Sequence, residues 1–223
     1  MVLLRTENLH KVYNNGNKPL HVLKGIDLVI EEGSIVAIVG PSGSGKTTLL
    51  NLLGGLDKPT EGYVFLRDLD LYSLSDRELS QIRNKTFGFV FQFYHLLAEF
   101  NVLENVLLPA LVDGFNNLNQ LKKKAQDLLA RVGLKGKENN FPSQLSGGEL
   151  QKVAICRSLI NGPKVLFCDE PTGNLDAVSR DEVIALLKEL NLKEKMTVVL
   201  VTHNEKLTYI ADKVVYLKDG TLN

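Results

Sequence analysis

The 223-residue sequence lacks several features that would point to whole classes of protein. Its 26 Lys and Arg balance its 26 Asp and Glu, so no global charge favours a nucleic acid or an anionic surface as partner. No apolar stretch approaches the length that crosses a bilayer, and the first residues lack the basic start and apolar block of a signal peptide. The only two cysteines, Cys156 and Cys168, lie in apolar patterns that fit reduced core thiols. We therefore expect a cytoplasmic protein with one full core.

The strongest positive feature is a glycine-rich segment between a predicted strand, 35–39, and a run of leucines with helical spacing. Its residues are Gly40, Pro41, Ser42, Gly43, Ser44, Gly45, Lys46, Thr47 and Thr48. This is the context of a P-loop, in which backbone N–H groups and a helix N-terminus bind phosphate oxygens. Lys46 would reach the β- and γ-phosphates and the Thr47 hydroxyl would bind magnesium. The segment therefore predicts a nucleoside triphosphate and Mg²⁺ as ligands.

Polar side chains end two further apolar runs. Gln92 follows the run 87–91, and a neutral amide can bind magnesium or orient a water molecule. Asp169 and Glu170 follow the run 165–168, and two unpaired carboxylates at the end of a buried strand are costly unless a cation is near. Because successive strand residues point to opposite sides of a sheet, we expect one acid to meet magnesium and the other an attacking water.

Two isolated side chains are weaker candidates. His203 follows the predicted strand 196–201 and is a candidate contact for the γ-phosphate; capping of the next helix through His203 and Asn204 is the alternative. Tyr13 ends the first of two or three antiparallel strands predicted near the N-terminus. A lone tyrosine is usually an ordinary half-buried residue, and stacking on a base is the other reading.

A helix start lies in the second half of the chain, in the segment 144–149. Ser146 and Glu149 have capping-box spacing, so Gly147 and Gly148 open a helix whose N-terminal amides can bind an anion. Taken alone, a well-capped helix explains the segment equally well.

An apolar cluster follows Gln92 and is unusual for a surface loop. Core packing is the expected fate of most of its members, and docking of a partner helix is the alternative. The cluster comprises Phe93, Tyr94, Leu96, Leu97 and Phe100.

Seven segments in this order resemble the motifs of ABC transporter ATPases. They are the aromatic loop at Tyr13, the P-loop at 40–48, the glutamine loop at Gln92, the signature at 145–149, the acidic strand at 165–170, the aspartate loop at 173–176 and the switch histidine at His203. The resemblance covers essentially the whole chain. It implies an α/β fold of the P-loop NTPase class and ABC ATPase type, with a RecA-like core sheet, an N-terminal antiparallel β subdomain and an inserted helical subdomain. We expect a single domain, 1–223, with the nucleotide-binding core in 1–92 and 160–223 and the helical signature subdomain in 93–159.

The same resemblance implies a mechanism and the residues that perform it. Two copies would hold two ATP molecules head to tail, each between one chain's P-loop and the other chain's signature. Because hydrolysis needs both copies, it would report closure of the dimer, and closure can drive a membrane partner. The implied roles are adenine stacking for Tyr13, general base for Glu170, γ-phosphate sensing for His203, magnesium and water binding for Thr47, Gln92 and Asp169, contacts across the dimer for Asp176, and nucleotide binding in trans for Ser146, Gly147, Gly148 and Glu149.

A narrower resemblance lies in the stretch 91–100, with 103–106 and Pro109, which is similar to the ATPase subunits of bacterial lipoprotein-releasing systems. It implies a peripheral position on the cytoplasmic face of the inner membrane, and permease subunits that dock between Phe93 and Phe100. The cargo would be a lipoprotein released toward the outer membrane, which this chain would not touch.

Other members of the family remain alternatives. The segment 171–176 is shared with macrolide-efflux and cell-division ATPases, which would make the chain a nucleotide-controlled recruitment module. A chromosome- or repair-type ATPase fits less well because the segment between the P-loop and the acidic strand has no sustained heptads. A P-loop small-molecule kinase would leave 145–149 and His203 without a role. Leu150, Lys152 and Cys156 depart from the family pattern on the signature helix, beyond the nucleotide contacts.

Overall fold

The structure is a computed structural model that describes residues 1–16, 18–112 and 117–222. Its strands are β1 (Val2–Asn15), β2 (Lys18–Glu31), β3 (Ile35–Val39), β4 (Glu61–Leu66), β5 (Leu69–Asp70), β6 (Phe87–Phe91), β7 (Val165–Asp169), β8 (Thr197–Val201), β9 (Lys213–Lys218) and β10 (Thr221–Leu222). Its α-helices are α1 (Lys46–Leu53), α2 (Asp76–Thr86), α3 (Val102–Leu107), α4 (Leu118–Arg131), α5 (Gly147–Leu159), α6 (Ala177–Glu194) and α7 (Glu205–Tyr209), and its short 3-10 helices are η1 (Leu71–Ser73), η2 (Leu108–Leu111) and η3 (Pro142–Gln144).

The central sheet has six strands in the order β10-β9-β3-β8-β7-β6. Strands β9, β3, β8, β7 and β6 run parallel, and β10 pairs antiparallel with β9. Three of the apolar runs recognised in the sequence are the central strands β3, β8 and β7, whose residues are almost all buried because a parallel sheet is covered on both faces. The run 87–91 is β6, at the edge of the sheet. Since parallel strands end at one edge, the segments after β3, β6, β7 and β8 meet there.

The second sheet is antiparallel and has the order β2-β1-β4-β5. β1 and β2 form a long hairpin that pairs from Val2 with Glu31 to Asn15 with Lys18. A register shift interrupts β1 between Thr6 and Leu9, where the backbone of Asn8 lies so close to Gly62 that a Cβ on Gly62 would be 2.1 Å from the Asn8 carbonyl oxygen. The antiparallel strands predicted near the N-terminus are confirmed, with two later strands added to them.

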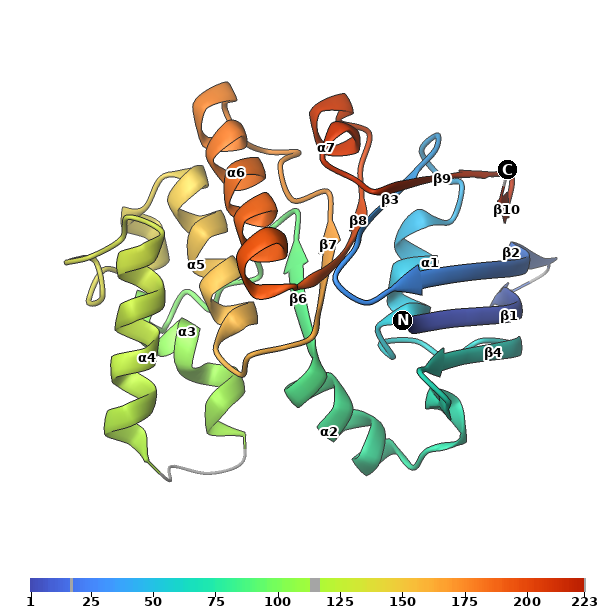
Figure 1. Cartoon of the computed structure of the whole chain (residues 1–223), viewed down its shortest axis with the longest axis horizontal. Helices are drawn as coiled ribbons and strands as arrows, with labels where there is room; N and C mark the ends of the chain where they lie inside the picture. The colour runs from blue at the N-terminus through green and yellow to red at the C-terminus, as the bar shows by residue number, and fades with distance from the viewer. Residues whose placement is uncertain (17, 113–116, 223) are drawn as a thin grey trace.

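Alternate residues of the central strands face two different hydrophobic cores. Ile35 and Ala37 of β3 lie in a core shared with α3, α4, α5 and α6, whereas Val36 and Ile38 lie in a core shared with α1 and the antiparallel sheet. Figure 1 shows the result, with helices α3, α4 and α5 at one end of the molecule and strands β1, β2 and β4 at the other. The predicted α/β class, with an antiparallel β part and a helical part beside the core sheet, is confirmed.

The helical part runs from the loop after β6 to the end of α5 at Leu159. The expected subdomain boundaries, 93 and 159, agree with these element ends and stay a prediction. Cys156 and Cys168 are free, buried thiols of the helix-side core, and burial raises the pKa of Cys156 to about 12. The prediction of reduced core cysteines is therefore confirmed.

The apolar cluster after Gln92 corrects one expectation. Phe93, Leu97 and Phe100 are exposed, to 68%, 44% and 37%, and only Tyr94 and Leu96 pack against the helix-side core. Core packing was therefore the wrong expectation for three of the five side chains, because the chain leaves the sheet after β6 and crosses the surface before α3 begins.

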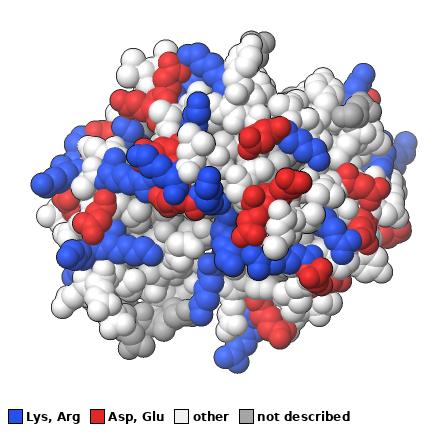
Figure 2. Space-filling model, viewed as in Figure 1, with Lys and Arg blue, Asp and Glu red and all other residues white. Residues whose placement is uncertain are grey.

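The surface carries both signs of charge. Figure 2 shows Lys and Arg interspersed with Asp and Glu across much of the face it presents, in keeping with the balanced composition. Within the described ranges, no helix is both long enough and apolar enough to cross a membrane.

Candidate functional site

The backbone of the P-loop takes conformations that favour glycine. Gly40 has φ +152°, and a Cβ there would lie 2.0 Å from the carbonyl oxygen of Leu217 in β9. Gly43 and Gly45 have φ +78° and +102°, and Gly45 is the N-cap residue of α1. The loop between β3 and α1 can therefore wrap tightly around a phosphate group.

Two polar side chains of this loop fit an anion. The Lys46 ammonium donates to the carbonyl oxygens of Gly40 and Pro41 at 3.0 and 2.9 Å, which places the positive charge inside the loop. The Ser44 hydroxyl is buried and has no hydrogen-bond partner among the described residues. A buried hydroxyl without a partner and an ammonium bound only to carbonyls are groups that phosphate oxygens would satisfy.

Asp169, the last residue of β7, lies beside the start of α1. The Thr47 hydroxyl donates to both carboxylate oxygens, at 3.2 and 3.0 Å. Burial raises the pKa of Asp169; the nearby charge of Glu170 adds to this effect, and the Thr47 hydrogen bond and Lys46 oppose it. A hydroxyl and a carboxylate in contact, on adjacent elements, are oxygen ligands of the kind Mg²⁺ prefers.

Glu170 lies in the same region, but its backbone is not the continuation of a strand that the sequence predicted. β7 ends at Asp169, and Glu170 has φ +47°, a left-handed conformation that costs of order 1–3 kcal/mol for a residue with a Cβ. The backbone N–H of Glu170 donates to the Val201 carbonyl at 2.9 Å, which holds the turn. Glu170 therefore lies on a turn, and the expected alternation of the two acids along a strand does not apply.

The Glu170 carboxylate is paired with His203, which follows β8. Its Oε1 lies 2.8 Å from Nδ1 of His203, and the backbone N–H of His203 donates to Oε2 at 3.4 Å. Asn204, and not His203, caps α7, since its side chain accepts from the N–H of Lys206. Helix capping, the alternative role considered for His203, is therefore performed by its neighbour Asn204.

Gln92 lies just beyond β6 and is held by the loop after β7. Its side-chain amide donates to the Asn174 side chain at 3.3 Å, and the Asn174 amide donates back to the Gln92 carbonyl oxygen at 3.2 Å. Asn174 belongs to the aspartate loop at 173–176 but was not itself a candidate site residue, and its contact with Gln92 now identifies it.

A cavity of about 440 Å³ brings most of the candidates together. It lies at the carboxyl edge of the parallel sheet, where ligands of open α/β sheets bind. Val22 and Val201 also line it; neither was predicted, because an apolar strand residue gives no chemical signal. The lining residues are Val22, Ser42, Gly43, Gly45, Lys46, Thr47, Thr48, Gln92, Asp169, Glu170, Val201 and His203.

The signature segment forms a second cluster outside this lining. Ser146 and Glu149 make the predicted capping box at the start of α5, and Lys137 pairs with the Glu149 carboxylate. Gly148 packs so closely on Ser179 that a Cβ would lie 2.3 Å from the Ser179 hydroxyl, which itself donates to Asp176 at 2.6 Å. The start of α5 and the Asp176 loop are thus one packed unit, and Gly147 lies beside it.

Tyr13 also lies outside the lining residues of the cavity. It is half-buried in β1, two residues before that strand ends, and its hydroxyl donates to Asp57 at 2.8 Å. The structure therefore gives its ring a fixed position without bringing it into the phosphate site.

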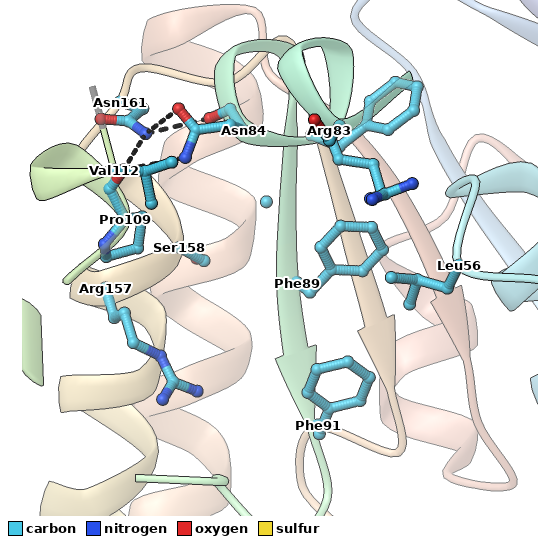
Figure 3. A pocket seen from close by; sticks show the side chains of 13 residues that line it. Leu56, Arg83, Asn84, Phe89, Phe91, Pro109, Val112, Arg157, Ser158 and Asn161 are labelled. Atoms are coloured by element: carbon cyan, nitrogen blue, oxygen red, sulfur yellow. Dashed lines mark hydrogen bonds between the residues drawn. The ribbon is translucent and has the colours of Figure 1, made fainter. Parts of the chain in front are cut away.

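A second cavity of about 440 Å³ lies between β6 and α5 (Figure 3). Phe89 and Phe91 project from β6 beside Leu56, while Arg157 and Ser158 approach from α5. At one end the Asn161 amide, two residues beyond α5, donates to Asn84 of α2 and to the carbonyl oxygen of Pro109 in η2. We refer to this cavity as the β6–α5 groove.

A phosphate-binding loop facing a glutamate–histidine pair across the sheet edge is the arrangement of a P-loop ATPase. The family model described as ABC transporter matches residues 23–173, and the chain belongs to this family. The lipoprotein-releasing system ATP-binding protein LolD of Wigglesworthia glossinidia brevipalpis is 47% identical over 222 residues, covering 100% of this chain and 96% of the relative. LolD of Shewanella frigidimarina is 48% identical and covers 99% of this chain and 92% of the relative. The solved dimeric post-hydrolysis state of the ATP-binding cassette MJ0796 bound to ADP and Pi has a TM-score of 0.92 at 40% identity, covering 99% of this chain and 97% of that one.

Glu149 gives a pH-dependent prediction for the signature cluster. The hydrogen bond from Lys137, followed by that from the Ser146 backbone, lowers the pKa of Glu149 below its ordinary value of 4.5. Its ionised form therefore stabilises the fold fully above pH 4.5, and this contribution is lost as the pH falls through the lowered pKa. We expect Glu149→Gln to lower the free energy of unfolding by about 0.5–1 kcal/mol at pH 7, measured by urea denaturation.

The control is Glu99→Gln, since Glu99 is exposed on the surface loop before α3. It should change the free energy of unfolding by less than about 0.5 kcal/mol at every pH. If Glu149→Gln lowered the free energy of unfolding by the same amount below the pKa of Glu149 as at pH 7, the effect could not be assigned to the ionised carboxylate.

Proposed function

We propose that this chain is the ATP-hydrolysing subunit of an inner-membrane complex that releases lipoproteins toward the outer membrane. The observation that carries the proposal is similarity to LolD proteins along the whole chain at 45–48% identity. The cavity supports the enzymatic part, because groups of the kinds that bind phosphate, bind Mg²⁺ and accept a proton line it together. The subunit would lie on the cytoplasmic face of the membrane as a peripheral protein.

Glu170 is proposed as the general base of hydrolysis. Its carboxylate accepts a proton from the attacking water, whose oxygen forms a bond to the γ-phosphorus of ATP as the bond to the β–γ bridging oxygen breaks. His203 holds the carboxylate through Nδ1 at 2.8 Å, and its other ring nitrogen would face a γ-phosphate oxygen. Lys46 and the P-loop amides bind the phosphates and stabilise the charge that develops on them.

Oxygen ligands for magnesium are available from three residues of the cavity. We assign this role to the Thr47 hydroxyl, the Asp169 carboxylate and the Gln92 side-chain carbonyl, all of which line the cavity. A bound Mg²⁺ neutralises phosphate charge and orients the β- and γ-phosphates. Without it, Asp169 and Glu170 repel each other across adjacent positions, which adds to the raised pKa of Asp169.

A homodimer is proposed to complete the site. Ser146, Gly147, Gly148, Glu149 and Asp176 form a unit apart from the cavity, so a partner copy would have to present this unit to the nucleotide. The N-terminus of the 13-residue helix α5 would then face the γ-phosphate, where its partial positive charge is favourable. Hydrolysis would thus depend on closure of the dimer.

The loop after Gln92 is proposed to dock permease subunits. Its exposed apolar side chains, Phe93, Leu97 and Phe100, are carried by a firmly held backbone. The buried Asn105 amide donates to three carbonyl oxygens of residues 97, 100 and 101 and accepts from the Leu97 N–H. The groove between β6 and α5 adjoins this loop through Phe91 and Arg157. A preformed apolar surface beside a groove suits a helix of a membrane partner.

The assignment of Glu170 predicts a separation of binding from hydrolysis. Glu170→Gln removes the proton acceptor but keeps side-chain size and hydrogen bonding to His203. We expect ATP affinity to stay within about threefold and turnover to fall at least about 100-fold, as loss of a general base does. Calorimetric binding and phosphate release measure the two quantities, and near-normal turnover would contradict the assignment.

The assignment of the signature in trans predicts complementation. Ser146→Arg and Lys46→Ala should each abolish hydrolysis in a homodimer, because each damages both composite sites. Their 1:1 mixture contains heterodimers with one intact site, so up to roughly a quarter of wild-type turnover should return if the sites act independently. Asn119→Arg on the exposed side of α4 controls for the added charge and should remain active alone. Absence of recovery at every mixing ratio argues against the sandwich.

The docking loop and the cargo are tested together by affinity capture. Glu170→Gln protein with Mg-ATP, incubated with detergent-solubilised inner membranes, should retain integral proteins with large periplasmic domains and a bound lipoprotein. Adding Phe93→Ser should reduce their recovery about tenfold, as loss of a central apolar contact does. Leu192→Ser is the matched control, since Leu192 is 59% exposed on α6 away from this loop.

The outcomes separate the proposals. Recovery of membrane partners without a lipoprotein would favour the macrolide-efflux or cell-division alternatives. Equal recovery with Phe93→Ser and Leu192→Ser would place the docking surface elsewhere.

A further inference from the structure

A lysine and an aspartate hold the ring of Tyr13 from two sides. The Tyr13 hydroxyl donates to Oδ2 of Asp57 at 2.8 Å, and the Lys11 ammonium donates to Oδ1 at 2.7 Å. The same ammonium lies 4.7 Å from the centroid of the Tyr13 ring, over one of its faces. None of the sequence motifs includes Lys11 or Asp57.

This ion pair differs from an ordinary surface pair in its burial. Lys11 is 8% exposed, and a buried ammonium is tolerated only when it has hydrogen-bond partners. Besides Asp57, the Lys11 ammonium donates to the Lys58 carbonyl oxygen at 2.7 Å. Partial burial of Asp57 raises the pKa of its carboxyl, but hydrogen bonds from Lys11, Tyr13 and the Lys58 backbone lower it by more. The carboxylate is therefore ionised at neutral pH and accepts from all three donors at once.

Asp57 is in turn fixed relative to the P-loop helix. The Tyr72 hydroxyl lies 2.5 Å from the carbonyl oxygens of both Leu52, in α1, and Asp57. Arg83 donates to the Gly55 carbonyl oxygen at 2.9 Å. The loop that leaves α1 is thus tied at several points, so the carboxylate has a defined position relative to the phosphate cradle.

The Tyr13 ring is covered on one face and still accessible to a ligand. The Lys11 ammonium lies over that face, the hydroxyl is anchored on Asp57, and the residue as a whole is only half-buried. Burial and the Asp57 hydrogen bond raise the pKa of Tyr13, and the nearby side chain of Thr48, a P-loop residue, opposes them. A ring anchored on its back and at its tip, beside the phosphate cradle, is a platform for a planar base.

We propose that Lys11 and Asp57 are positioning residues that hold Tyr13 as the stacking platform for the nucleotide base. The proposal rests on the assignment of Tyr13 to adenine in the proposed function. Ordering the ring before the ligand arrives lowers the entropy lost on binding, so the pair contributes to affinity for the base and not for the phosphates. It therefore acts on nucleotides and not on inorganic phosphates.

Two ligands that share phosphates but not a base test this. The dissociation constants of ADP and of inorganic pyrophosphate, both with Mg²⁺, are measured by calorimetry for the full-length chain. Asp57→Asn and Lys11→Met should each weaken ADP binding about five- to tenfold, which is part of the affinity that one stacked base contributes. Each should weaken pyrophosphate binding less than about twofold. Asp76→Asn is the matched control, because Asp76 forms an exposed ion pair with Lys58, and it should change neither constant.

A double-mutant cycle separates positioning from a general loosening of the loop. In a Tyr13→Phe background, where the hydroxyl is absent, Asp57→Asn should add less than about twofold to the loss of ADP affinity. Equal weakening of ADP and pyrophosphate, a full additional loss in the Tyr13→Phe background, or unchanged ADP affinity in both single variants would each overturn the proposal. Thermal unfolding of each variant checks that it is folded. If Asp57→Asn does not fold, the Lys11→Met variant tests the proposal.

Tyr13→Ala distinguishes failure of this inference from failure of the assignment beneath it. If Tyr13→Ala weakens ADP selectively while Asp57→Asn and Lys11→Met do not, stacking stands and the positioning role falls. If Tyr13→Ala leaves the ratio of the ADP and pyrophosphate constants unchanged, the stacking role itself falls, and the positioning role with it.

Discussion

The parallel register of β3, β8, β7 and β6 is the constraint on which the site depends. Each strand is hydrogen-bonded to its neighbour in the same direction, so the residues that follow all four emerge at one edge. The P-loop, Gln92, the two acids and His203 are far apart in the chain and yet line one cavity for this reason. A parallel sheet in turn requires cover on both faces, and the two hydrophobic cores supply that cover.

Three strained or costly features of the molecule lie at that edge. Glu170 adopts a left-handed conformation, Asp169 has a raised pKa, and the Ser44 hydroxyl is buried without a partner among the described residues. Each is unfavourable in a stable fold taken alone, and the proposed binding of phosphates and Mg²⁺ would compensate each of them. The nearly fully buried strands beneath provide the rigidity that maintains these conformations.

Sequence patterns predicted most of this arrangement because they reflect strong local rules. Continuous apolar runs identified the buried strands, and the spacing of Ser146 and Glu149 predicted the capping box that the structure contains. The turn at Glu170 was missed because nothing in a Glu predicts a positive φ. The exposure of Phe93 was missed because an apolar side chain carries no information about whether a partner or the core covers it. Lys11 and Asp57 were missed because their contact joins positions 46 residues apart through the fold alone.

The loop after β6 links the P-loop cavity to the β6–α5 groove within a few residues. The Gln92 side chain lines the cavity, while the carbonyl oxygens of Tyr94 and His95 accept hydrogen bonds from Arg157 at 2.7 and 2.5 Å. Arg157 lines the groove and belongs to α5, the helix that the signature begins. Tyr94 and His95 have φ +61° and +49°, which are two successive strained conformations. The Arg157 guanidinium holds the carbonyl groups of both residues. If a partner docks in the groove as proposed, it would meet a side chain that holds the backbone two and three residues after Gln92.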